Sequence, residues 1–124
     1  MHDDRRSAQR HEVSGAIVFY RREQEEVEKE HLGILENIGL GGLLLATHEE
    51  LPTGTLLLMR IYSQVGPPGH SEVKVRGTVQ RPSEHPKGVG IRFLETSAHD
   101  REGLQGLIAT LSSAHHPELA GALV

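Results

Sequence analysis

Apolar residues occur along this chain in short runs, which are separated by polar, glycine-rich or proline-rich segments. Six runs have the length and the β-branched or aliphatic content typical of strands: residues 13–20, 31–38, 43–47, 55–62, 72–80 and 88–94. In the run EVKVRGTVQ at 72–80 apolar and polar positions alternate, which predicts an antiparallel strand with one buried face. The pattern therefore predicts a protein built mainly of strands.

The segments between these runs predict turns and loops. Three glycines within residues 39–42 indicate a tight turn or bulge, and the proline- and glycine-rich stretch 65–70 indicates a loop. We also expect turns at 50–54 and 81–87, and a solvated hairpin end in the charged stretch 21–30.

Helical periodicity is found only near the C-terminus. The i, i+3, i+4, i+7 spacing of one helix face is met by four aliphatic residues: Leu104, Leu107, Ile108 and Leu111. Ser97, three residues before Asp100, predicts a capping box at the start of this helix. We expect the aliphatic stripe to pack in the core, with a contact between copies of the chain as the alternative.

Strands at short spacing followed by one helix predict an all-β barrel or sandwich with a helix packed on it. The same order argues against a parallel sheet of βαβ units. A length of 124 residues fits one domain. We expect a flexible arginine-bearing arm at 1–12, the domain with its terminal helix at 13–112, and a tail at 113–124.

Composition narrows the class of function. A formal charge of -4 and an aromatic content of 3% give neither bulk attraction to nucleic acid nor rings on which bases could stack. The absence of cysteine excludes disulfides and thiolate chemistry and is compatible with a reducing cytosol. No apolar run resembles a signal peptide or a membrane-spanning helix, so we expect a cytoplasmic protein without membrane insertion.

Motifs of known catalytic sites are missing from the sequence. It contains no G-x-S-x-G string, and the His-Glu pairs at 11–12 and 48–49 lack the second histidine of a zinc protease motif. The string GLGGLL at 39–44 does not fit the dinucleotide-binding fingerprint. We therefore expect no enzymatic activity, no catalytic residue, no metal site and no cofactor.

Two features could together bind a small nucleotide. Arg6 and Arg10 lie four residues apart in the arm, and guanidinium groups bind phosphate oxygens in bidentate fashion and stack on purine rings. Asn37 can both donate to and accept from a base edge. Gly41 and Gly42 lack a Cβ, which lets a flat ring approach the backbone.

Five motifs follow one another in a fixed order. They are an R-x-x-x-R arm (6–10), a turn of the [D/N]-x-S-x-x-G type (37–42), a T-x-L strand (55–59), a G-x-V strand (77–79) and GVGIRF (88–93). This ordered set, over about residues 5 to 112, resembles the PilZ domain family. The resemblance implies a six-stranded antiparallel β-barrel with a C-terminal α-helix, and a bacterial receptor for the second messenger cyclic di-GMP.

The resemblance also implies roles for residues. Arg6 and Arg10 would clamp phosphates and guanine faces, while Asn37 and Gly42 would meet the second guanine. An arginine directly before the R-x-x-x-R run, here Arg5, is associated in this family with two mutually intercalated cyclic di-GMP molecules. Nucleotide binding would order the arm and change the surface offered to an unidentified protein partner.

One position departs from the family pattern. Gly39 stands where the family usually has serine, so a hydroxyl that could contact guanine or phosphate is absent. An alternative therefore stays open, a PilZ-like interaction module that binds protein partners and no nucleotide. For Arg76 and Arg92, on the outward faces of predicted strands, we expect exposure to solvent.

Overall fold

The computed structural model of the chain describes residues 10–26, 29–64 and 72–115. Its elements are β1 (His11–Glu12), β2 (Ala16–Arg22), β3 (His31–Ile38), β4 (Gly42–Ala46), β5 (Leu56–Ser63), β6 (Glu72–Glu84), β7 (Lys87–Leu94) and α2 (Ala98–His115). Arg5, Arg6, most of the predicted arm, the predicted loop at 65–70 and most of the predicted tail lie outside the described residues.

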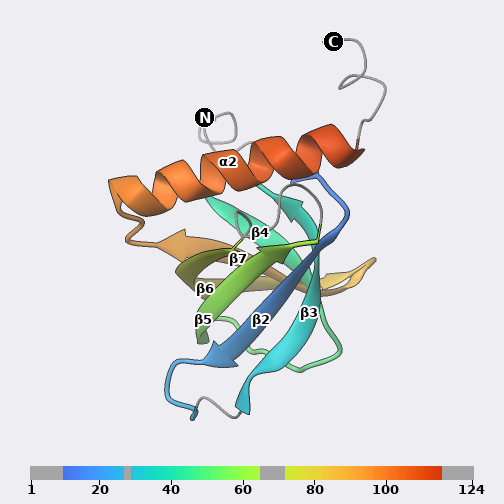
Figure 1. Ribbon diagram of the computed structural model, residues 1–124. Coiled ribbons are helices and arrows are strands. Elements are labelled where there is room, and N and C mark those ends of the chain that lie inside the picture. The colour runs from blue at the N-terminus through green and yellow to red at the C-terminus, as the bar shows by residue number, and fades with distance from the viewer. Residues whose placement is uncertain (1–9, 27–28, 65–71, 116–124) are drawn as a thin grey trace, which may run out of the picture.

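The strands form a closed antiparallel barrel (Figure 1). Six strands follow one another in the order β3, β2, β5, β6, β7, β4, and β4 pairs again with β3, which closes the ring. The predicted six-stranded barrel with a C-terminal helix is therefore confirmed. The barrel gains one further short strand, β1, which pairs with the end of β3 through His11 opposite Ile38 and Glu12 opposite Asn37.

Alternation along the strands builds the core. In β6 the predicted inward positions, Val73, Val75, Gly77 and Val79, are all buried. A side chain at Gly77 would force its neighbours to shift, because its Cβ would lie 2.5 Å from Cγ2 of Ile91 and 2.8 Å from Cε of Met59. The interior is otherwise filled mainly by leucine, isoleucine and valine, as the composition predicts.

Helix α2 lies across one end of the barrel (Figure 1). The Ser97 hydroxyl accepts a hydrogen bond of 3.0 Å from the Asp100 N–H, so the predicted N-terminal cap is confirmed. Leu104, Leu107 and Leu111 are buried in the core cluster, which favours the core interpretation of the aliphatic stripe. In the described part of the chain, α2 lacks the apolar character that a membrane-spanning helix of its length requires.

The turn predicted at 81–87 is wrong. β6 continues to Glu84 and β7 begins at Lys87, so only His85 and Pro86 connect the two strands. The polar residues of this segment pair in a strand ladder, for example Arg81 with Gly90 and Glu84 with Lys87. Exposed strand ends carry polar residues and proline more readily than central ones, which is why this segment has the composition of a turn.

Candidate functional site

A cleft of about 710 Å³ opens on the outer surface of the barrel, where the β3–β4 turn meets β6 and β7. Ten residues line it: Arg10, Asn37, Gly41, Leu44, Gln80, Arg81, Pro82, Ser83, Gly90 and Arg92. Three of the residues predicted from the sequence, Arg10, Asn37 and Gly41, therefore lie on one surface. The cleft combines guanidinium, amide and hydroxyl groups with stretches of bare backbone.

Arg10 and Asn37 are in direct contact. Nη1 of Arg10 donates a hydrogen bond of 3.3 Å to Oδ1 of Asn37. The pairing of β1 with β3 explains this contact, because Arg10 directly precedes His11, which lies opposite Ile38. Arg10 has an exposed surface, but part of its guanidinium is shielded from water. This partial desolvation, and to a lesser extent the charge of Arg81, lowers the pKa of Arg10.

The turn between β3 and β4 brings the backbone close to Arg10. The Gly39 N–H donates to the Gly42 carbonyl at 2.9 Å, and the Phe93 N–H donates to the Gly41 carbonyl at 2.9 Å. A Cβ at Gly42 would lie 2.1 Å from the Ile91 carbonyl oxygen and 3.0 Å from Nη2 of Arg10. Only glycine fits this position, and the guanidinium of Arg10 lies over it.

The structure thus gathers four of the predicted residues, and one lies slightly apart. Arg10, Asn37 and Gly41 line the cleft, and Gly42 lies beneath Arg10. Gly39 belongs to the same turn through its hydrogen bond to Gly42 but is not among the lining residues.

Two further arginines of the cleft, Arg81 and Arg92, were not predicted as site residues. Arg92 is exposed as expected, and it also lines the cleft. The alternation of Gly90, Ile91 and Arg92 in β7 already indicated that Arg92 points outward on the same face as Gly90. Arg81 gave no such signal. Strict alternation from the buried Val79 would turn it inward, but a register shift between Val79 and Arg81 turns it outward.

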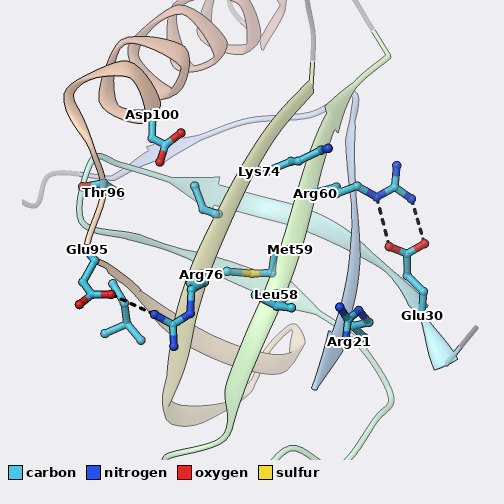
Figure 2. A pocket seen from close by; sticks show the side chains of 12 residues that line it. Arg21, Glu30, Leu58, Met59, Arg60, Lys74, Arg76, Glu95, Thr96 and Asp100 are labelled. Atoms are coloured by element: carbon cyan, nitrogen blue, oxygen red, sulfur yellow. Dashed lines mark hydrogen bonds and ion pairs between the residues drawn. The ribbon is translucent and has the colours of Figure 1, made fainter. Parts of the chain in front are cut away.

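A second cavity of about 500 Å³ lies over the outer faces of β5 and β6, near the start of α2 (Figure 2). Its two central arginines are already neutralised. Arg60 forms ion pairs with Glu30 at 2.8 Å and Glu72 at 2.9 Å. Arg76, which we expected to be free in solvent, forms ion pairs with Glu23 at 2.9 Å and Glu95 at 3.0 Å.

The two cavities therefore differ in electrostatic character. Within the described ranges, Arg10, Arg81 and Arg92 have no carboxylate within ion-pair distance, so the first cleft keeps its positive charge. An anionic group is attracted to such a surface, whereas the second cavity offers paired charges.

A closed six-stranded barrel with one helix and an arginine-lined outer cleft defines a class of small β-barrel domain suited to binding an anion. The chain belongs to the PilZ domain family, whose model matches residues 4–110. It is similar in fold to a solved structure of the PilZ domain with c-di-GMP of YcgR from Escherichia coli, with a TM-score of 0.64. The match covers 90% of this chain and 96% of that chain at 16% sequence identity. No curated protein matches the sequence.

Proposed function

We propose that this protein is a bacterial receptor for cyclic di-GMP and that the nucleotide binds in the arginine-lined cleft. The observation that carries the proposal is the contact between Arg10 and Asn37 above the bare backbone of Gly42. Membership of the PilZ family supports it, as does the nucleotide named with the YcgR domain. We propose a binding role and no catalysis, in the cytoplasm.

Each contacting group has a definite task in this proposal. The Arg10 guanidinium pairs with a phosphate through its parallel N–H groups or stacks on a guanine face. Asn37 uses the donor and acceptor of its amide on a guanine edge. Gly41 lines the cleft and leaves its backbone open to the ring, while Gly42 lets Arg10 lie close against the barrel. Arg6, outside the described residues, completes the clamp with Arg10.

The proposal extends to signalling. An arm that closes over bound nucleotide changes the surface of the domain, and ordering of a segment by a phosphate ligand is an established type of switch. β1 gives this change a path into the barrel, because Arg10 directly precedes the strand that pairs with Asn37 and Ile38. We propose that a protein partner reads the changed surface.

Calorimetric titration of the full chain with cyclic di-GMP tests the proposal. Arg10→Ala is expected to weaken binding by about ten- to a hundredfold, because a hydrogen bond to a charged group contributes about 1.5 to 3 kcal/mol. Arg6→Ala is expected to lose a comparable amount. Arg76→Ala is the control, because Arg76 lies in the second cavity and is paired with carboxylates.

Two outcomes would contradict the proposal. Equal losses in all three variants would mean that the attraction is diffuse rather than local. No heat of binding from a protein whose circular dichroism shows a folded β-barrel would favour the interaction module that binds no nucleotide.

A further inference from the structure

Two arginines that were not predicted to bind the ligand complete the wall of the cleft. Arg81 belongs to β6 and Arg92 belongs to β7, and both line the same cleft as Arg10. We propose that Arg81 and Arg92 form a second anion subsite, which binds a phosphodiester other than the one held by Arg10. This inference rests on the proposed function, because it assigns further residues to the same ligand.

Strand register brings the three arginines to one surface. Arg92 lies opposite Gly42 of β4, the residue over which the Arg10 guanidinium lies. Arg81 lies opposite Gly90, two residues from Arg92 on the same outward face of β7. Gly42 thus lies beneath Arg10 and beside Arg92, and Gly90 lies beside Arg81.

Gly42 and Gly90 have no side chain to protrude from this surface. A Cβ at Gly90 would already be in van der Waals contact with Arg81, at 3.7 Å from Cγ and 3.9 Å from Nε. The Arg81 side chain therefore lies along the backbone of Gly90. Gly42 and Gly90 therefore let the side chains of Arg10 and Arg81 lie close against the barrel wall.

Arg10 and Arg81 place like charges in one cleft. The charge of Arg81 is felt at Arg10, and neither residue has a carboxylate partner in the described part of the chain. The chain has more acidic than basic residues, with 17 Asp and Glu against 13 Lys and Arg. Carboxylates pair with Arg60 and Arg76 in the second cavity but not with Arg10 or Arg81 in the described residues. Like charges held together without counterions are typical of a surface that meets an anion.

The spacing of charge indicates the ligand class. One phosphate monoanion is matched by one guanidinium, whereas this cleft offers one on its β1 side and two on its β6–β7 side. A molecule with two phosphodiesters, or two molecules packed together, supplies anions to both sides. The shared chemistry is a second phosphodiester, from the same nucleotide or from a second one.

The test measures cyclic di-GMP binding by calorimetry in Arg81→Gln and Arg92→Gln, which remove the charge and keep a polar side chain. Lys74→Gln is the matched control, because Lys74 is an exposed cation of β6 without a carboxylate partner in the described residues, and it lies outside the cleft. Each cleft variant is expected to raise the Kd about tenfold or more, and the control less than about twofold.

The stoichiometry separates the two sources of the phosphodiester. Variants that still bind as many molecules as the wild type, only more weakly, indicate the second phosphate of one nucleotide. An end-point that falls from two molecules per chain to one indicates a second nucleotide at Arg81 and Arg92.

The remaining outcomes overturn the assignment. If Arg81→Gln and Arg92→Gln bind like Lys74→Gln while Arg10→Ala loses binding, the subsite is wrong and the proposed function stands. If the wild type does not bind cyclic di-GMP, the proposed function fails first. Thermal melts of both variants should superimpose on that of the wild type, and a large loss of stability would contradict their description as free surface cations.

Discussion

Gly42 lies where the backbones of β4 and β7 and the guanidinium of Arg10 come together. Its absent Cβ would lie 2.1 Å from the Ile91 carbonyl oxygen, a distance that only a backbone shift can relieve. We expect Gly42→Ala to lower the free energy of unfolding by about 1 to 3 kcal/mol, as overpacking does. Gly90→Ala is the control, because its Cβ would make only ordinary contacts of 3.7 Å or more. Chemical denaturation compares the two variants, and equal loss would contradict the close approach at Gly42.

Gly39 is the residue at which this chain departs from the family pattern. In the described part of the chain the glycines with left-handed φ angles are Gly15 and Gly54, so the backbone at Gly39 does not itself exclude serine. We expect Gly39→Ser to strengthen cyclic di-GMP binding about two- to twelvefold, the value of one neutral hydrogen bond. Calorimetry measures the change. Weaker binding by a variant of unchanged stability would mean that the hydroxyl has no partner in the complex.

At the scale of elements, Tyr20 joins β2 to the segment that follows β4. Its hydroxyl and Oγ1 of Thr47 are 2.6 Å apart in the interior. Burial, aided by the charge of Glu49, raises the pKa of Tyr20 despite the opposing effect of the Thr47 hydrogen bond. The neutral phenol is therefore favoured in the fold, whereas the unfolded chain ionises near pH 10.

This difference gives stability a dependence on alkaline pH. The contribution of Tyr20 is fully present below about pH 10 and is lost as the pH rises from there through the higher pKa of the folded state. We expect Tyr20→Phe to have a shallower fall in the free energy of unfolding between about pH 9 and about pH 11. The exposed Tyr62→Phe is the control. Denaturant titrations at several pH values check this, and parallel curves for wild type and Tyr20→Phe would contradict it.

The elements also show what could be predicted from the sequence and what could not. Alternation at 72–80 predicted the buried face of β6, and the capping box at Ser97 predicted the start of α2, because both patterns depend on neighbouring residues alone. The continuation of β6 to Glu84 could not be predicted, since its polar residues lack the alternation of a strand and are held in it by backbone pairing with β7. The same limit hid Arg81, whose outward direction depends on a register shift that no local pattern reveals.

At the scale of the whole molecule, the motifs at 37–42 and 88–93 meet at one cleft because β4 pairs with β7. The R-x-x-x-R arm reaches the same place through Arg10. Arg5 lies outside the described residues. It leads to a prediction of how many cyclic di-GMP molecules one chain binds. A third guanidinium in the arm supplies a further stacking plane and further charge, so we expect two cyclic di-GMP molecules per wild-type chain and one per Arg5→Leu chain. Calorimetric end-points count them, and one molecule per wild-type chain would contradict the role of Arg5.

An NMR titration of the isotope-labelled protein tests whether cyclic di-GMP binds in the arginine-lined cleft. Addition of the nucleotide is expected to shift the backbone amide signals of Asn37, Gly41, Gly90 and Arg92. The signal of Lys74, beside the ion-paired second cavity of Figure 2, should stay in place. An unchanged spectrum, or shifts confined to the surface around Lys74, would contradict binding in the arginine-lined cleft.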